Sequence, residues 1–365
     1  MAFDRGSMTF RICNLLQPLP DDLLERFNRD SAGSLESVKD EPVWGWVSGR
    51  HLLDTRIDDE TAILGGYVHL GLRQAQRKVP TSLLRAECRM AELALEAEKQ
   101  SRVNRKERKQ IKEEVTERLL PKMPPQLSGV PFVIDRNDSK LYLGATSEKQ
   151  LDVFLGMFYE TVGFEPVPQT PEIVAVDELN VDPDSLPPLS FSPDVPDSDA
   201  PGTVGQNFLT WLWYFQEECG GELPPSQLGR FSIMVDGPLV FVNEGPGAYE
   251  SALRKGTPTV SAEAKAALLV GKKLKRAKVI MAREREEEWS ATVDADSFVF
   301  RSLKVPEGEA LDPGSIFEER INNLYIFQKI FFALFQRFVK EMSDPDTAAK
   351  LQQDVKKWTD QRVGR

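Results

Sequence analysis

Basic side chains gather in one short stretch of this chain. Residues 99–122 read KQSRVNRKERKQIKEEVTERLLPK, and up to Lys112 this stretch holds seven Lys or Arg residues and a single acid, Glu107. Guanidinium and ammonium groups bind phosphate through charge-assisted hydrogen bonds. The stretch therefore indicates contact with a polyanion. Its candidate contact residues are Lys99, Arg102, Arg105, Lys106, Arg108, Lys109, Lys112 and Lys122.

A second basic group follows Gly271, in the sequence GKKLKRAK. If this segment is a strand, alternation puts Lys272 and Arg276 on one face and Lys273 and Lys275 on the other. A strand with charge on both faces is expected at the edge of a sheet or beside an open surface. The candidate polyanion-contacting residues of this group are Arg254, Lys255, Lys272, Lys273, Lys275 and Arg276.

These two groups stand out because the chain as a whole is acidic, with a formal net charge of -11. Between Lys149 and Arg230 there is no Lys or Arg at all. An acidic exterior with confined basic surfaces directs a polyanion to one place. A solvated helix face and a lysine-guarded edge strand explain the two groups equally well. If nucleic acid binds, phosphate contact should dominate and base readout should be weak.

Residues suited to catalysis are sparse. The cysteines, Cys13, Cys88 and Cys219, lie far apart, and His51 and His69 are the only histidines. Neither nucleophilic catalysis nor a Cys/His metal site is indicated by this spacing. We therefore expect no catalytic residue, no metal and no cofactor. The cysteine spacing also favours a reducing compartment, and the N-terminus lacks an apolar leader, so we expect a soluble cytoplasmic protein.

The elements that must position these groups predict an α+β protein. From Pro80 to about Leu120 the pattern is helical, but the apolar face almost disappears after Leu95. Such a segment either projects from the body or folds back near SRVNRK as a helical hairpin. We expect a central α/β body over residues 1–79 and 123–166 and a projecting helical tip over residues 80–122.

The second half is predicted to form a base domain. Residues 167–205 are rich in Pro and Asp and are expected to be a partly disordered linker or insertion. We expect an α/β base domain over residues 206–345, followed by a polar tail over residues 346–365. Within the base, FSIMVDGPLVFV is predicted to be a hairpin that turns at Asp236-Gly237. A closing amphipathic helix is predicted over residues 316–342. Some of its aromatic side chains should pack on its own domain and others on a second copy, among Phe327, Phe331, Phe332, Phe335 and Phe338.

Several of these segments, taken in order, resemble the RdgC family of recombination-associated, nucleoid-associated bacterial DNA-binding proteins. The resemblance is carried best by GWV at Gly45, by VPTSLLRAECRMAELALEAEKQSRVNRKERKQIKEEVTERLLPK from Val79, and by FVIDRNDSKLYLGATSEKQLDVFLGMF from Phe132. SAEAKAALLVGKKLKRAKVIM, WSATVDADSFVFRSLKVP and the final aromatic helix also fit, so the resemblance is expected to extend from about Met8 to Val339. Two departures are the long Pro/Asp insertion and Met123-Pro124-Pro125 after LLPK, where the family carries an aromatic residue near the tip contact.

The resemblance implies a head-to-head homodimeric ring whose central hole is lined by positive charge. Duplex DNA passes through the hole without sequence preference, and its occupation restrains a RecA-type recombinase. The family has no known catalytic chemistry and is nucleoid-associated in the cytoplasm. Our interpretation is non-sequence-specific binding of double-stranded DNA by an encircling homodimer. Two alternatives stay open: a protein-interaction module in which the basic tip or the acidic linker docks a partner protein, and a nuclease.

Overall fold

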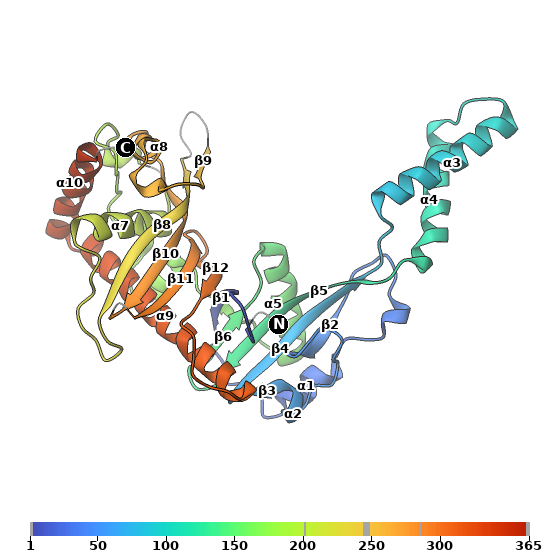
Figure 1. The fold of residues 1–365 in the computed structure, drawn as a ribbon, viewed down its shortest axis with the longest axis horizontal. Coiled ribbons are helices and arrows are strands. Elements are labelled where there is room, and N and C mark those ends of the chain that lie inside the picture. Colours follow the sequence, from blue (N-terminus) through green and yellow to red (C-terminus); the bar gives the residue numbers. More distant parts are fainter. Residues whose placement is uncertain (1–2, 201, 244–248, 285, 363–365) are drawn as a thin grey trace. The chain divides into compact units, whose positions relative to one another are not determined.

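The computed structural model describes residues 3–200, 202–243, 249–284 and 286–362, which fall into two compact units (Figure 1). The smaller unit comprises residues 19–63 and 69–132. The larger unit comprises residues 1–18, 64–68 and 133–365, within the described ranges. Helices and a large antiparallel sheet together confirm the α+β class.

The smaller unit is built on three strands in the order β2-β4-β5. Its aromatic core joins Phe27 and Trp46, whose ring centroids lie 4.9 Å apart, to Phe132. Gly45 on β2 is required because a Cβ there would lie 2.4 Å from the Cα of Ala32. Its elements are α1 (Leu23–Arg29), β2 (Val43–Ser48), α2 (Asp59–Ala62), α3 (Thr81–Lys99) and α4 (Arg105–Leu119). The strands β3 (Ile63–Leu64), β4 (Tyr67–Gln76) and β5 (Gln126–Asp135) contribute residues to both units.

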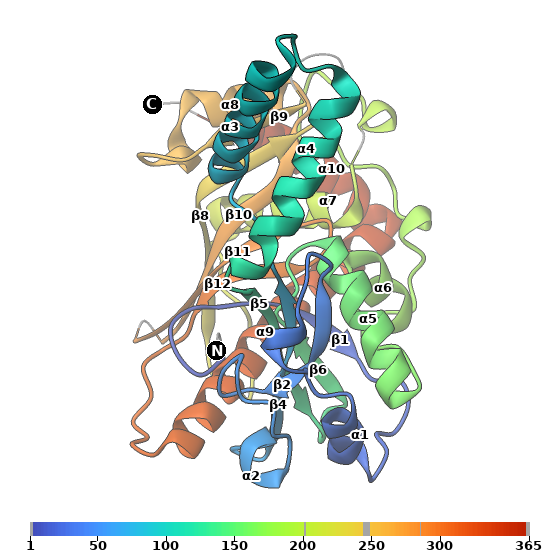
Figure 2. The same cartoon turned by 90° about the vertical axis from the view of Figure 1, so that its right-hand side faces the viewer.

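Helices α3 and α4 form a helical hairpin, one of the two arrangements expected from the sequence (Figure 2). A narrow apolar seam joins them. On α4 the buried residues recur every fourth position, at Ile111, Val115 and Leu119. Half-buried apolar residues of α3 pack against them, with Val103 of the turn buried at one end. This α3–α4 seam buries one narrow stripe of each helix and leaves the remaining faces to solvent.

The larger unit contains an antiparallel sheet in the order β6-β1-β12-β11-β10-β8-β9. The strand β10 therefore has a neighbour on each side, β11 and β8. The strands are β1 (Met8–Asn14), β6 (Lys140–Leu143), β7 (Val167–Pro168), β8 (Phe231–Val242), β9 (Glu250–Leu253), β10 (Lys273–Arg283), β11 (Glu287–Asp294) and β12 (Val299–Lys304). The helices are α5 (Glu148–Val162), α6 (Pro171–Asp177), α7 (Val204–Glu218), α8 (Ala262–Leu269), α9 (Pro313–Ser343) and α10 (Pro345–Gln361).

Aromatic side chains dominate the core of the larger unit. The rings of Phe298 and Phe300 on the sheet meet Phe331 of α9 edge-on, with centroids 5.0 and 4.9 Å apart. The ring centroids of Phe208 on α7 and Phe335 on α9 lie 5.1 Å apart. The predicted closing helix is thus confirmed as α9. Its aromatic residues Phe327, Phe331, Phe335 and Phe338 are buried in this core, and Phe332 is half-buried.

The predicted hairpin at Asp236-Gly237 is wrong, because β8 runs as one strand from Phe231 to Val242. Its pairing with β10 continues on both sides of Gly237 and shifts register twice near it. A β-bulge accommodates residues such as Gly and Pro within a strand, which is why the turn-like sequence does not turn here.

The Pro/Asp-rich segment of residues 167–205 also differs from a disordered linker. It contains α6 and two short 3₁₀ turns, Pro183–Ser185 and Asp197–Asp199. Leu189 and Phe191 are buried in the core of the larger unit. Val174, Ala175 and Val204 of the same segment are also buried in that core, and burial of these apolar side chains offsets the loss of chain entropy.

The structure also differs from the polar tail expected at the C-terminal end. Residues 345–361 form α10, and Leu351, Val355 and Trp358 bury one face of it at helical spacing. Residues 363–365 of that expected tail lie outside the described residues. No helix in the described part of the chain is both long enough and apolar enough to cross a bilayer.

The end of α10 is held by a cation clamped between two indoles. The guanidinium of Arg362 lies 4.0 Å from the ring centroid of Trp213 and 4.9 Å from that of Trp358. It donates to Glu217 at 2.6 Å, and the same carboxylate accepts hydrogen bonds from both indole N–H groups at 2.8 Å. The side chain of Arg362 is only 9% exposed, so solvent screens these interactions little.

We predict that Arg362→Ala lowers the free energy of unfolding by about 2 kcal/mol, because it removes the cation–π interaction and weakens the carboxylate network. Arg362→Lys should recover only part of this stability, because an ammonium cannot stack as a planar guanidinium does. Urea unfolding followed by tryptophan fluorescence measures both variants. Equal stability of Arg362→Ala and the parent chain would refute the clamp.

Candidate nucleic-acid interface

The predicted basic residues from Lys99 to Lys112 lie in or near the turn of the α3–α4 hairpin, whereas Lys122 lies in a 3₁₀ turn beyond the far end of α4. Helix α3 ends at Lys99, where Gln100 adopts a left-handed conformation with φ of 52°. Helix α4 begins after Asn104, whose side chain accepts from the Glu107 amide at 3.0 Å. Glu107 in turn accepts from the Asn104 amide at 2.9 Å. This reciprocal cap satisfies backbone donors that the helix leaves open and fixes the start of α4.

Only part of the positive charge at this turn is neutralised within the chain. Lys99 pairs with Glu107 at 2.6 Å, Lys109 with Glu113 at 3.6 Å, and Arg108 approaches Glu92 at 4.0 Å. The remaining predicted residues are exposed and form no ion pair with any described residue. We call these residues the free tip cations: Arg102, Arg105, Lys106, Lys112 and Lys122.

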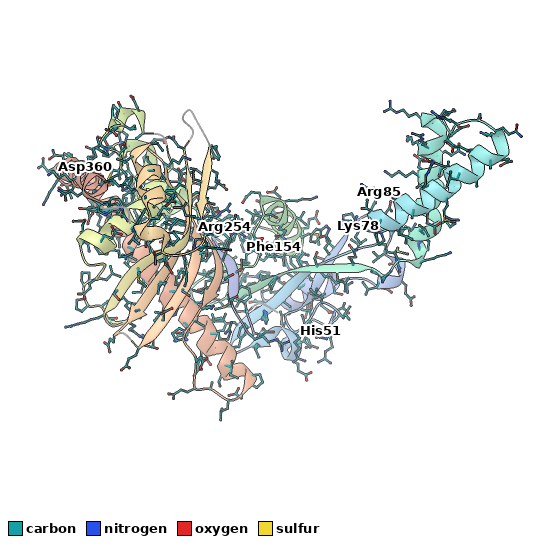
Figure 3. All side chains as sticks on the ribbon, turned by 45° about the horizontal axis from the view of Figure 1, so that its top comes forward. His51, Lys78, Arg85, Phe154, Arg254 and Asp360 are labelled. Carbon is teal, nitrogen blue, oxygen red and sulfur yellow. The ribbon has the colours of Figure 1, made fainter. Side chains whose placement is uncertain are left out.

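Two more exposed basic residues precede the turn and were missing from the predicted set. Lys78 lies just before α3 and Arg85 lies on its first turns (Figure 3). Neither forms an ion pair with a described residue. Lys78 follows Arg77 and Arg85 stands four residues before Arg89, but neither lies within the dense basic stretch of residues 99–122.

The face of α3 opposite the α3–α4 seam is apolar and exposed. Met90 is 68% exposed and Leu93 is 50% exposed. With the exposed Ala86 and Ala97 they follow a spacing of four, three and four residues, which places them on one stripe of the helix. We call these four residues the α3 stripe. The spacing of these apolar residues is visible in the sequence, but the many charged residues around them make the stripe hard to recognise.

The second basic group does not lie on an edge strand, so the edge, one of the two placements expected from the sequence, is wrong. Pairing with β11 and with β8 on either side makes β10 an interior strand. Ala277, Val279 and Met281 point into the core, and the alternate positions carry the charges.

Interior placement is possible because the charges of this group find partners. Arg276 donates to Asp294 of β11 at 2.8 Å, and Lys275 lies 3.4 Å from Asp296. Lys272 donates to the hydroxyl of Ser251 on β9 at 2.5 Å. These are the interactions that make charged residues tolerable on a strand with two neighbours.

Lys273 is the most deeply buried cation of the group, with 1% exposure. Burial lowers the pKa of its ammonium to about 8, against a smaller opposing effect of Asp197. Among the described residues, the only hydrogen-bond acceptor for its amine is the carbonyl oxygen of Ala200, at 3.4 Å. A buried lysine of this kind presents no charge to a polyanion at the surface. Arg254 and Lys255, just after β9, are exposed and form no ion pair with a described residue.

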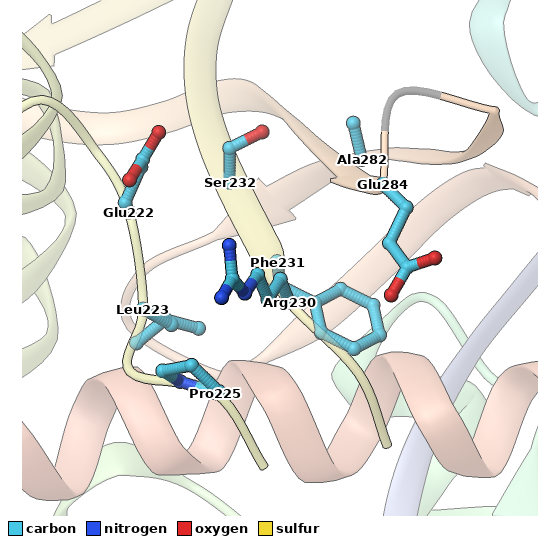
Figure 4. A pocket seen from close by; sticks show the side chains of 8 residues that line it. All are labelled: Glu222, Leu223, Pro225, Arg230, Phe231, Ser232, Ala282 and Glu284. Atoms are coloured by element: carbon cyan, nitrogen blue, oxygen red, sulfur yellow. The ribbon is translucent and has the colours of Figure 1, made fainter. Parts of the chain in front are cut away.

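A hollow of about 680 Å³ lies at the start of β8 and contains charged residues (Figure 4). The guanidinium of Arg230 points toward the side where Glu222 lies, and Glu284 lies on the other side.

In the described part of the chain, no group of three or more His, Cys, Asp or Glu residues could hold a metal ion. Among the cysteines, Cys13 is buried, and burial raises the pKa of its thiol to about 12.

Comparison with known proteins finds a similarity that spans the whole of the tip. The family model described as "Putative exonuclease, RdgC" matches residues 6–176. A "Recombination-associated protein RdgC" from Pseudoalteromonas atlantica is 30% identical over 103 residues. That match covers 28% of this chain and 34% of the relative, about a third of its length. The resemblance to the RdgC family is thus confirmed for residues 6–176, which include the α3–α4 hairpin.

The match ends at residue 176, before the second basic group and before most of the Pro/Asp-rich segment. The two printed descriptions name different properties, an exonuclease in one and an association with recombination in the other.

Proposed function

We propose that this protein binds double-stranded DNA without sequence preference, through the free tip cations, as a homodimer that encircles the duplex. The observation that carries the proposal is positive charge left without a partner at the hairpin turn of a chain whose net charge is -11. Elsewhere acidic residues prevail, so the electrostatic attraction for a polyanion is confined to this surface.

Phosphate contact, and not base readout, is the chemistry that this surface supports. Its charges sit on a helix start and a short turn, on flexible side chains that adapt to a backbone of regular charge. Arg102 and Arg105 can each bind a phosphate through two N–H groups, whereas Lys106 acts as a point charge. Such contacts release counterions, so binding should weaken steeply with salt and should be alike for all sequences.

The α3 stripe supports the homodimer. An exposed apolar stripe at spacings of three and four residues is the pattern with which helices pair. Met90 and Leu93 project from the face opposite the α3–α4 seam, so pairing with the same stripe of a second copy would leave the seam intact. Two hairpins joined in this way would bring two sets of free tip cations to one duplex.

We place the protein in recombination, as an antagonist that occupies the duplex and restrains access of a RecA-type recombinase. Support comes from the name of the Pseudoalteromonas relative, which associates that protein with recombination. A nucleoid-associated role is the cellular counterpart of binding to any duplex sequence. Arg254 and Lys255 are secondary DNA contacts in this proposal, and the paired or buried cations of β10 contribute less.

We predict that the triple variant Arg102→Gln, Arg105→Gln, Lys106→Gln binds duplex DNA at least about tenfold more weakly at low salt. The log–log salt slope should fall by roughly 0.9 for each phosphate that the variant no longer neutralises. Stability should not fall, because removing positive charge from the first turn of α4 favours the helix dipole. Fluorescence anisotropy with duplexes of several sequences, at a series of salt concentrations, measures affinity and slope.

The matched control is Arg136→Gln, Lys149→Gln, Lys350→Gln, which removes the same charge from exposed residues of the larger unit that form no ion pair with a described residue. An equal loss of affinity in both triple variants would mean that only net charge matters and would contradict the proposal. The same complexes incubated with Mg²⁺ test the exonuclease named in the family description, and we expect the DNA to stay intact.

For the homodimer, we predict that Met90→Glu with Leu93→Glu converts a dimer into a monomer at micromolar concentration. Charge on both sides of a helix pair repels the second copy and removes the apolar contact. Light scattering coupled to size exclusion measures the mass. The control, Tyr159→Glu with Val176→Glu, alters two other exposed apolar residues and should leave the dimer. A parent chain that is already monomeric, or a dimer unaffected by the stripe variant, would refute this mode of pairing.

A further inference from the structure

An apolar groove with an acidic rim runs between the Pro/Asp-rich segment and the last two helices of the larger unit. Two hollows of about 470 and 480 Å³ form it, and they adjoin at Leu186, Pro187 and Met342, which line both. Val181 and Ala349 extend the apolar lining on one side, and Phe338 of α9 extends it on the other.

The groove wall is held in place by interactions on both of its sides. Gln352 of α10 donates to the carbonyl oxygen of Pro188 at 2.7 Å. Lys356 pairs with Asp197 at 2.7 Å, and Ser192 donates to the carbonyl oxygen of Leu269 at 2.6 Å. The buried Leu189 anchors the segment between these points. The groove is therefore pre-formed, which reduces the entropy lost when a ligand binds.

The charged groups that line the groove are all carboxylates. Glu172, Asp182 and Asp184 contribute carboxylates, and none of them forms an ion pair with a described residue. The amide oxygen of Asn207 is buried in the wall and has no hydrogen-bond partner among the described residues. A buried acceptor without a donor costs free energy, so a ligand that brings N–H groups would be favoured here.

We propose that this groove binds a segment of a different protein in which an Arg or Lys side chain adjoins an apolar one. The cation would meet Glu172 and Asp184, and the apolar side chain would cover Leu186 and Met342. Arg suits the acceptor-rich lining best, because a guanidinium has five donors and no acceptor. Nucleic acid does not fit, since residues 150–229 contain no Lys or Arg and would repel phosphate.

This inference is independent of DNA binding by the tip. Apart from Glu172, the lining residues follow residue 176, where the match to the family model ends, so the groove lies almost wholly beyond the part shared with the family. One chain would thus have two binding surfaces of opposite charge. The acidic groove would bind a basic protein segment, and the free tip cations would bind the polyanionic duplex.

The test uses the full chain and three short fluorescein-labelled peptides, of alternating Arg and Leu, of alternating Arg and Gly, and of alternating Glu and Leu. We expect the Arg–Leu peptide to bind most tightly by fluorescence anisotropy and the Glu–Leu peptide not to bind. Glu172→Lys with Asp184→Lys should weaken Arg–Leu binding by about tenfold or more, since attraction becomes repulsion at both ends.

The matched control is Asp152→Lys with Glu160→Lys, which makes the same charge change at exposed residues of α5. The control should keep the affinity of the parent chain. Equal losses of affinity in both double variants, or no preference for Arg–Leu over Arg–Gly, would overturn the proposal, because either result means attraction to net charge alone. Tighter binding of a labelled peptide of residues 99–122, abolished in the groove variant, would identify a second copy as the occupant and also overturn it.

Discussion

The proposed function depends on the narrow seam between α3 and α4. Ile111, Val115 and Leu119 bury one stripe of α4, with Val103 at the turn, and nothing in this seam needs the outer faces of either helix. Because so little of the helical surface is used for folding, the outer faces can carry unpaired cations around the turn and an apolar stripe on α3. A broader seam would have required an apolar residue where Lys112 now stands, three residues before Val115 and seven before Leu119.

Charge is treated differently in the two basic groups, and the difference is one of local partners. In the α3–α4 hairpin, acids within helical reach neutralise only some cations, so the free tip cations remain. In the sheet, Asp294 and Asp296 meet Arg276 and Lys275, and burial lowers the pKa of Lys273. The same residue types thus form an exposed basic surface in one unit and part of an interior strand in the other.

How much the sequence could predict follows from the range of each interaction. The helical hairpin was one of the two arrangements predicted, because the apolar residues of its seam recur at helical spacing within a short stretch. Helix α9 was predictable because its amphipathic pattern extends over many turns. The interior position of β10 was not, because its partners come from β8, β9 and the turn after β11. Leu189 and Phe191 order a segment whose composition is typical of disorder. The amphipathic spacing of Leu351, Val355 and Trp358 was visible in the sequence but was outweighed by the polar composition of the tail.

Contact between the hairpin turn and duplex phosphate is the claim on which the account depends most. It can be tested by replacing Ser101, an uncharged exposed residue between Lys99 and Arg102, with the photo-cross-linking residue p-benzoylphenylalanine. The same replacement at Asn137, an exposed residue of the larger unit, is the control. The account predicts a cross-link to duplex DNA of any sequence from position 101, diminished by salt, and little from position 137. Undiminished DNA binding with no cross-link from position 101 would contradict it.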